Sequence, residues 1–176
     1  PTDLATEVSG ISPLRTPTAD FYRIDTALTL PRVDLDSWRL RIDGDVDNPY
    51  ELSFDDLLAM PLVERDITLN CVSNEVGGPY IGSTRWLGVR TADLLAEAGV
   101  TGDADAIYQT SVDGWTCATP LEAVTDDRDA MLAVAMNGEP LPVEHGFPVR
   151  MIVPGLYGFV SATKWITDIE VTRFDR

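Results

Sequence analysis

The stretch TLNCVSNEVGG, residues 68–78, poses the central question about this chain. Residues 63–72, which lead into and overlap it, alternate between apolar and polar types, which predicts a strand with Ile67, Leu69 and Cys71 on one face. A polar pair and then two glycines follow the strand. Because the chain has only 2 cysteines in 176 residues, a cysteine at the mouth of a glycine-containing loop raises the question of what its sulfur does there.

The composition indicates a single globular domain with a strongly acidic surface. A chain of 176 residues can enclose one sizeable core. The 29 acidic and 13 basic residues give a net charge of -16. This balance argues against nucleic acid as a partner, because binding to a phosphate backbone depends on clustered cations. No apolar run approaches the roughly 20 residues of a membrane-spanning helix. The chain opens abruptly at PTDLATEV, so we expect an excised domain or a mature product.

Alternating and apolar runs predict most of the strands. Residues 37–46 carry Trp38, Leu40 and Ile42 in alternation, as expected of a half-buried strand. Two further runs flank Asp113 and Gly114, which predicts a hairpin with a primed turn. The other predicted strands are residues 63–72, 131–136, 147–155 and 164–174.

Capping residues predict three short helices. Ser53 is expected to cap a helix in LSFDDLLAMP, with Asp56 at the third helical position. Thr91 and Gly99 are expected to cap the two ends of a helix in TADLLAEAG. Thr119 opens the sequence Thr-Pro-Leu-Glu, which predicts a capping box with proline in the first turn.

Short helices that interrupt many strands predict an α+β fold with a mixed or antiparallel β-sheet core, rather than a regular series of βαβ units. We expect residues 1–19 to form an irregular N-terminal arm over the domain and residues 20–176 to form that single domain. The sequence contains neither GxGxxG nor a Walker motif.

The residues alone leave several kinds of chemistry open for Cys71. It can form a disulfide with Cys117. It can also act as a nucleophile with His145 and Asp113, because a cysteine needs a base or a cationic neighbour to become a thiolate. A structural zinc site would need about four Cys or His ligands, more than this chain offers at close spacing. The last possibility is a single thiolate ligand to a metal that arrives within an organic chelator.

A chelator with an anionic end requires groups that bind anions. Arginine, lysine, hydroxyl groups and the backbone N–H groups of glycine loops can do this. The C-terminal third supplies all of them, in HGFPVR at residues 145–150 and in PGLYGFVSATKW at residues 154–165, which contains the only lysine of the chain, Lys164.

The succession of motifs resembles the molybdopterin-binding domain of the sulfite oxidase family, from about residue 20 to residue 172. Each motif is modest alone, and the order is what carries the resemblance. The motifs are FYR (21–23), WRLRIDG (38–44), TLNCVSN (68–74), RWLGV (85–89), LLAEAG (94–99), the Asp-Gly hairpin (113–114), MNGEPLP (136–142), HGFPVR (145–150), VPGLYG (153–158) and KW (164–165).

This resemblance implies a molybdenum–molybdopterin cofactor and assigns residues to it. Cys71 matches the family's molybdenum-ligating cysteine. Tyr22 and Arg23 match the arm that closes over the cofactor and the substrate, and Tyr157 and Arg85 are candidates for the substrate face. The further cofactor-binding candidates are Asn74, Thr110, Ser111, His145, Arg150, Ser161, Ala162, Thr163 and Lys164.

The function implied by the resemblance is oxygen-atom transfer to or from a small oxyanion such as sulfite, or a sulfoxide-like substrate. Without a haem or dimerisation domain, the chain is similar to the exported bacterial members of the family. We therefore expect an extracytoplasmic domain, the soluble part of a membrane-anchored protein, that trades electrons with a separate or membrane-tethered partner. Two alternatives stay open: a cysteine-nucleophile hydrolase, and an extracellular binding domain that keeps the fold without the cofactor.

Overall fold

The computed structural model describes residues 8–176 and consists mainly of two β-sheets. The strands are β1 (Leu40–Gly44), β2 (Tyr50–Leu52), β3 (Leu62–Asn70), β4 (Ile81–Arg90), β5 (Ala106–Ser111), β6 (Thr116–Pro120), β7 (Met131–Met136), β8 (Glu139–Pro140), β9 (Arg150–Ile152) and β10 (Ile166–Thr172). The first sheet has the order β2-β1-β10-β5-β6, with β1 and β10 parallel. The second has the order β3-β4-β7-β8, with β9 also paired to β7, and all its pairs are antiparallel.

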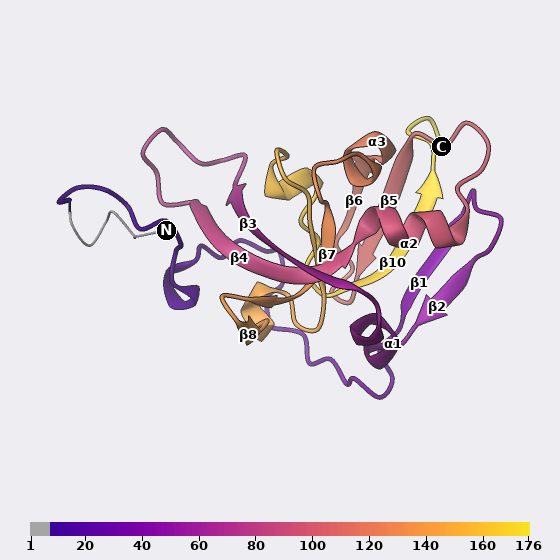
Figure 1. Cartoon of the computed structure of the whole chain (residues 1–176), viewed down its shortest axis with the longest axis horizontal. Coiled ribbons are helices and arrows are strands. Elements are labelled where there is room, and N and C mark those ends of the chain that lie inside the picture. Colours follow the sequence, from indigo (N-terminus) through magenta and orange to yellow (C-terminus); the bar gives the residue numbers. More distant parts are fainter. Residues whose placement is uncertain (1–7) are drawn as a thin grey trace.

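Short helices connect these strands. They are the α-helices α1 (Phe54–Ala59), α2 (Thr91–Ala98) and α3 (Leu121–Thr125) and the 3-10 turns η2 (Thr18–Asp20), η3 (Val143–His145) and η4 (Gly158–Val160). Helix α2 contacts β1 of the first sheet and β4 and β7 of the second, while the long β3–β4 ribbon extends away from the first sheet (Figure 1). This mixed architecture confirms the predicted α+β class. None of the helices formed by residues 8–176 is long and apolar enough to cross a membrane.

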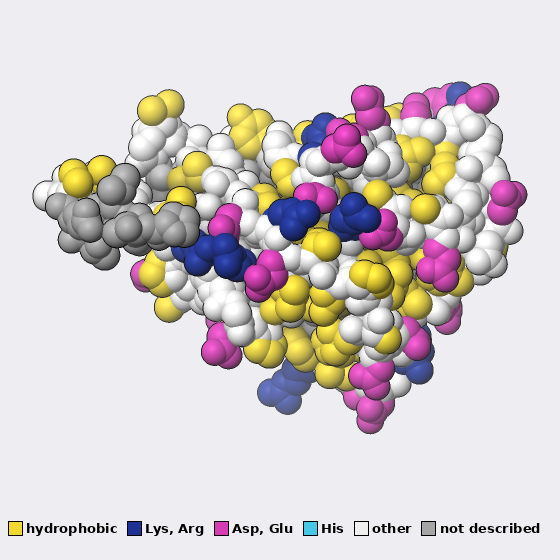
Figure 2. All heavy atoms as spheres, in the orientation of Figure 1, with side chains coloured by type: hydrophobic (Ala, Val, Ile, Leu, Met, Phe, Trp, Pro, Cys, Tyr) yellow, Lys and Arg dark blue, Asp and Glu magenta, His cyan; other side chains and the backbone are white. Residues whose placement is uncertain are grey.

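Two apolar clusters fill the interior. The larger one joins both sheets and α2, with fully buried side chains such as Leu40, Leu94 and Leu132. The smaller one lies under the N-terminal arm and includes Phe21 and Trp86. Acidic side chains are scattered over the face seen in Figure 2 and do not form one patch, in keeping with the net charge of -16.

Several local predictions are confirmed. Trp38, Leu40 and Ile42 are at most 4% exposed, as the alternation requires. The Ser53 side chain accepts a hydrogen bond from the Asp56 N–H, and the Asp56 carboxylate accepts one from the Ser53 N–H, so the capping box is complete.

Other local predictions are wrong in their details. Thr91 is the first residue of α2, whose N-cap is Arg90. Thr119 lies in β6, fully buried, and its hydroxyl donates to the carbonyl of Val160 at 2.6 Å, so it cannot cap α3. A primed turn of type I′ requires positive φ at both central residues. In the β5–β6 turn only Gly114 has positive φ.

The N-terminal arm is fastened across the edge of the second sheet. The Thr16 N–H donates to the carbonyl of Ser83 at 2.6 Å. Phe21 then packs on Gly82, where an added Cβ would come within 2.6 Å of the Phe21 ring. Residues 1–7 of the predicted arm lie outside the described residues, and the proposed domain boundary at residues 19 and 20 stays a prediction.

Candidate active site

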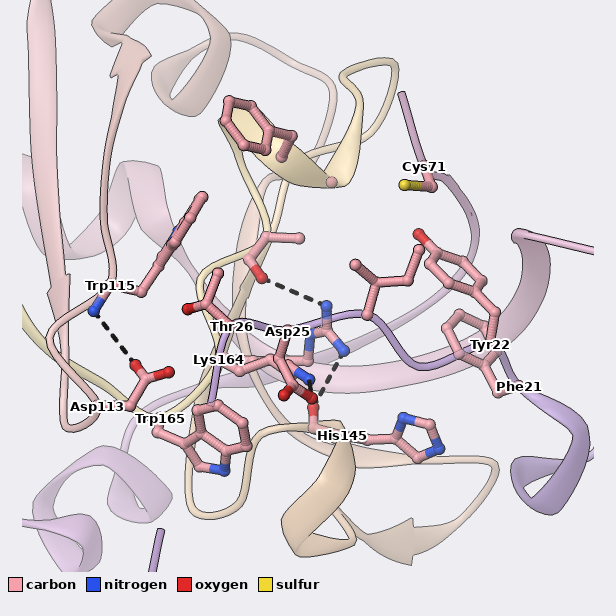
Figure 3. A pocket seen from close by; sticks show the side chains of 15 residues that line it. Phe21, Tyr22, Asp25, Thr26, Cys71, Asp113, Trp115, His145, Lys164 and Trp165 are labelled. Carbon is pink, nitrogen blue, oxygen red and sulfur yellow. Dashed lines mark hydrogen bonds and ion pairs between the residues drawn. The ribbon is translucent and has the colours of Figure 1, made fainter. Parts of the chain in front are cut away.

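A cavity of about 210 Å³ opens beside Cys71. Its wall combines the arm at residues 21–26, the end of β3, the turn at residues 113–115 and parts of the segment at residues 145–165. Figure 3 shows Lys164 in the middle of the cavity, with Cys71 on one side and Trp115 on the other. Six predicted site residues line it, namely Tyr22, Cys71, His145, Arg150, Ala162 and Lys164.

Cys71 directly follows β3 and is 8% exposed. Its N–H donates to the carbonyl of Tyr80 at 2.9 Å, and its carbonyl accepts from the Asn74 N–H at 3.0 Å, so the loop fixes the cysteine backbone. Both cysteines are free, and the Cys117 sulfur lies 3.2 Å from the Thr163 hydroxyl. The alternative of a Cys71–Cys117 disulfide is therefore wrong, and the Cys71 sulfur is available as a ligand.

Arg150 begins β9 and carries a buried positive charge, since the residue is 6% exposed. Its Nη1 donates to the carbonyl of His145 at 3.0 Å, and its Nη2 donates to the carbonyl of Ala162 at 3.4 Å. Its Nε has no hydrogen-bond partner among residues 8–176. Burial lowers the pKa of Arg150 to about 10, so the side chain still carries its charge at neutral pH. A buried cation with a free donor fits an anionic ligand.

Gly146 allows the two cationic side chains of the cavity to come together. Its φ of 115° lies in the left-handed region. A Cβ at this position would fall 2.9 Å from the Arg150 Cβ and 3.2 Å from the Lys164 Cβ. Glycine is required because only the absence of a side chain lets the η3 turn pack against both stems.

Lys164 forms a buried ion pair with a residue of the arm. Its Nζ lies 2.7 Å from the Asp25 carboxylate, and the two side chains are 8% and 7% exposed. The same Asp25 oxygen lies 2.8 Å from Nε of Arg23, whose side chain is 43% exposed. Burial lowers the pKa of Lys164 to about 8, against the opposing effect of Asp25. Burial would raise the pKa of Asp25, but the hydrogen bonds from Arg23 and Lys164 lower it overall. The carboxylate is therefore charged at neutral pH.

Tyr22 connects the arm to the Cys71 side of the cavity. Its ring stacks on Phe21, with centroids 5.3 Å apart. A Cβ at Gly158 would lie 3.4 Å from the Tyr22 oxygen, an ordinary contact distance, so the phenol lies directly against η4. Figure 3 shows that oxygen turned toward Cys71. Burial raises the pKa of Tyr22, so the phenol keeps its proton and can act as a hydrogen-bond donor.

His145 fastens the arm. It is 4% exposed, and its Nε2 lies 3.2 Å from the carbonyl oxygen of Thr18. Burial lowers the pKa of His145, so the ring is neutral and must carry its proton on Nε2 to make this bond. Asp113 accepts hydrogen bonds from the Ser111 hydroxyl and the Trp115 N–H. Cys71, His145 and Asp113 therefore do not form the hydrogen-bonded triad of a cysteine hydrolase.

Eight predicted site residues do not line the cavity, namely Arg23, Asn74, Arg85, Thr110, Ser111, Tyr157, Ser161 and Thr163. Asn74 closes the Cys71 loop, because its Oδ1 accepts from the Tyr80 N–H at 2.8 Å. Arg85 lies on β4 and pairs with Asp66 at 2.9 Å.

The other residues outside the lining shape its walls. The Ser161 hydroxyl donates to the carbonyl of Tyr157 at 2.9 Å, which stabilises the η4 turn. Thr163 is 1% exposed and faces Cys117, and the carbonyl of Thr110 accepts from the Thr167 hydroxyl at 3.3 Å. These contacts hold the loop and the hairpin in place, and the hydroxyls of Ser161 and Thr163 bond to neighbouring groups of the chain.

Sequence reasoning missed part of the lining. Asp25 and Thr26 lie shortly after the FYR motif, and Trp115 lies shortly after Thr110 and Ser111. Trp115 and Phe159 meet edge to face with their centroids 5.2 Å apart. Proximity in sequence to predicted site residues was the available signal for Asp25, Thr26 and Trp115.

Comparison with known proteins agrees with this site. Residues 27–176 match the family described as the oxidoreductase molybdopterin binding domain. The chain is 39% identical to the uncharacterized oxidoreductase YuiH of Bacillus subtilis over 80% of its length, and it covers 68% of that protein. It is 33% identical to human mitochondrial sulfite oxidase over 82% of its length, but it covers only 31% of that protein.

A solved structure shows the same fold. The sulfane dehydrogenase SoxCD from Paracoccus pantotrophus superposes with a TM-score of 0.74 and 31% identity, over 81% of this chain and 40% of that one. Fold, site and sequence thus define a molybdopterin-binding oxidoreductase domain. The chain belongs to the sulfite oxidase family within that class, and its cofactor is the molybdenum cofactor.

The residues of the cavity fit this cofactor. It offers a metal that accepts a protein sulfur and, at a distance from the metal, a phosphate. Cys71 supplies a free sulfur at one side of the cavity. Arg150 supplies a buried cation whose Nε–H has no partner in the described part of the chain, and Lys164 supplies a second cation. Cys71 would therefore hold the metal, and Arg150 and Lys164 would hold the phosphate.

Proposed function

We propose that this domain transfers an oxygen atom from a small sulfoxide-like substrate, with oxidation of a small oxyanion such as sulfite as the second candidate. The observation that carries the proposal is the free, buried Cys71 sulfur in a cavity with two cations on its far side. Family membership supports molybdenum-dependent oxidoreduction, and the lining of the cavity supports the choice of substrate.

The Cys71 side of the cavity favours a neutral substrate. Tyr22, whose ring stacks on Phe21, lines it with aromatic surface. The two arginines expected at the substrate face are already paired, Arg23 with Asp25 and Arg85 with Asp66. A sulfite dianion would thus meet neither arginine as a free cation there, within a chain of net charge -16. A neutral S=O group requires only a hydrogen-bond donor.

The chain's own groups would bind and orient the reactants. When bound, the cofactor supplies two-electron redox chemistry and accepts the oxygen. Reduction of a sulfoxide consumes two electrons and two protons and releases a thioether and water. The Tyr22 phenol, protonated at neutral pH, would donate a hydrogen bond to the S=O oxygen, and the aromatic rings would limit water at the reacting sulfur.

The electrons must come from elsewhere, because residues 8–176 contain no cluster of three or more His, Cys, Asp or Glu side chains that could hold a second redox metal. We assign this role to a separate or membrane-tethered electron-transfer protein. Placement outside the cytoplasm, as an exported domain of a membrane-anchored protein, is part of the same proposal.

The test uses chain produced in a host that makes the cofactor. Sulfoxide reduction is followed with a reduced viologen dye, and sulfite oxidation is followed with ferricyanide, for the wild type and Cys71→Ser. We expect molybdenum in the wild type, sulfoxide reduction that exceeds sulfite oxidation, and loss of both activities in Cys71→Ser. Sulfite oxidation as the faster reaction would reverse the choice of substrate. A soluble, folded wild type without molybdenum would favour the cofactor-free binding domain.

A further inference from the structure

A carboxylate of the chain itself occupies the anion-binding side of the cavity. Asp25 lines the cavity and lies 2.7 Å from Lys164, which is 139 residues away in sequence. Both side chains are at least nine-tenths buried. Figure 3 shows the Asp25 carboxylate against the Lys164 ammonium group in the middle of the cavity. The charge of Lys164, which would bind the cofactor phosphate, is therefore already compensated by the carboxylate of Asp25.

The segment that carries Asp25 is attached differently from the arm before it. Up to Phe21 the arm is held by backbone hydrogen bonds, by η2 and by burial of the Phe21 ring. From residue 22 to residue 33, no backbone–backbone hydrogen bond forms with any described residue. Leu28 within this segment is fully exposed. Tyr22 anchors the start of this segment by stacking on Phe21. Residues 23–26 are held in the cavity mainly by the ion pair of Asp25, so they can move while the arm up to Tyr22 stays fastened.

Two anions cannot share this position. A phosphate and a carboxylate on the same lysine repel each other, and the repulsion is strong where water is largely excluded. Phosphate can form bidentate contacts with Arg150, whose Nε donor is free among residues 8–176. The carboxylate of Asp25 makes no such contact with Arg150.

We propose that Asp25 acts as an internal stand-in for the cofactor phosphate: in the cofactor-free chain it holds residues 23–26 closed over the anion-binding side of the cavity, and it is displaced when the phosphate binds, while Tyr22 stays stacked on Phe21. This inference rests on the cofactor assignment and not on the proposed substrate. It makes Asp25 a competitor for cofactor binding and residues 23–26 a cover that opens for entry of the cofactor.

The first test measures binding of inorganic phosphate to the cofactor-free chain by titration calorimetry. If the stand-in occupies the site about 90% of the time, removing it tightens the apparent affinity about tenfold. Asp25→Asn should show this gain. Asp20→Asn, an equal charge change at an exposed position of the same arm, should bind phosphate as the wild type does. Adding Lys164→Met to Asp25→Asn should remove the gain. Equal affinity of Asp25→Asn and the wild type would overturn the proposal.

The second test needs no variant and uses limited trypsin digestion of the wild type. The cut after Arg23 is compared with the cut after Arg15, which is fastened to Asp66. Displacement of Asp25 releases Arg23, so the Arg23-to-Arg15 cleavage ratio should be several-fold higher in the molybdenum-loaded chain than in the cofactor-free chain. An equal or lower ratio in the loaded chain would overturn the proposal, even if Asp25→Asn fails to fold. Neither readout depends on the substrate, so each can fail while the proposed function holds.

Discussion

Replacing Arg150 by methionine should stabilise the cofactor-free fold and abolish cofactor retention. Burial lowers the pKa of Arg150 by more than two units from its ordinary value, to about 10. Since one pKa unit corresponds to about 1.4 kcal/mol, holding this charge inside costs the cofactor-free fold about 3 kcal/mol. Methionine removes the cost of the buried charge and keeps most of the volume of the aliphatic part of the Arg150 side chain.

The substitution also removes two hydrogen bonds and a cation–π contact, because the Arg150 guanidinium carbon lies 5.2 Å from the centroid of the Trp86 ring. The methionine thioether can replace that ring contact with one of similar strength, so the two hydrogen bonds decide the loss. The carbonyls of His145 and Ala162 lose their Arg150 donor, at about 1 kcal/mol each. The expected net result for Arg150→Met is a gain of about 1 kcal/mol in the free energy of unfolding, as found when other buried charges are replaced by apolar residues. Bound phosphate reverses the balance in the wild type, because the charge is then compensated.

Two measurements check this prediction. Urea denaturation of the cofactor-free chain, followed by tryptophan fluorescence, should show a midpoint raised by about 0.5 M at unchanged slope. Molybdenum per chain, after production in a cofactor-competent host, should fall below about a tenth of the wild-type value, as expected when over 1.4 kcal/mol of binding is lost. The control is Arg128→Met, whose side chain is 33% exposed and paired with Asp126. It should change neither quantity appreciably. A clearly destabilised Arg150→Met that keeps its molybdenum would refute the reasoning.

Three further variants test other parts of the account. Asp66→Asn should lower the melting temperature at pH 7 by about 2 °C, because surface pairs are worth little. Hydrogen bonds from two arginines lower the pKa of Asp66. The ionised Asp66 therefore stabilises the folded chain above about pH 4, and this stabilisation is lost as the pH falls below that value. The melting temperatures of wild type and Asp66→Asn should converge at acidic pH. Gly146→Ala should lower the free energy of unfolding by about 2 kcal/mol and prevent molybdenum retention. Its control is Gly102→Ala, which also has positive φ but open space around it; it should lower the free energy of unfolding by only about 1 kcal/mol and retain molybdenum. Equal effects of the two variants would mean that the contact of Gly146 with Arg150 is unimportant. The pKa of Lys164 in the folded chain, about 8, lies below its value in the unfolded chain. The free energy of unfolding of the cofactor-free wild type should therefore rise by about 2 kcal/mol from pH 8 to 10, and that of Lys164→Met should not. The same pH dependence of the free energy of unfolding in both proteins would contradict the burial of this charge.

The sequence predicts the fold best where a local pattern and the tertiary environment agree. Trp38, Leu40 and Ile42 alternate and are buried in β1. Thr119 illustrates the opposite case, because its capping pattern is overridden by burial in β6 and a bond to the Val160 carbonyl. The helix-capping pattern at Thr119 is a local signal, and strand pairing together with a contact to a residue far away in sequence outweighs it.

The site likewise contains residues that the sequence predicts and one that only the tertiary structure reveals. Cys71, Arg150 and Lys164 follow from motifs whose order is characteristic, and the structure brings all three to one cavity. Asp25 could not be identified, because one carboxylate among 29 acidic residues looks like surface charge. Its role depends on a contact across 139 residues. It also precedes the family match, which begins at residue 27.

Arg23 and Arg85 show why charge alone does not place a side chain. Both were predicted for the substrate face, but each has an acidic neighbour within reach, and an exposed ion pair competes with the cavity for the guanidinium. Arg23 pairs with Asp25, and Arg85 pairs with Asp66. In so acidic a chain, most arginines find such a partner.

The most direct test of the central claim is molybdenum-edge X-ray absorption on the loaded wild type, with Cys71→Ser as its reference. The account predicts that the wild-type metal has one more sulfur ligand than the metal in Cys71→Ser, because Cys71 donates its thiolate. Cys117→Ser serves as the control, and its sulfur count should equal that of the wild type, since the Cys117 sulfur faces Thr163. The same sulfur count in wild type and Cys71→Ser would contradict the account.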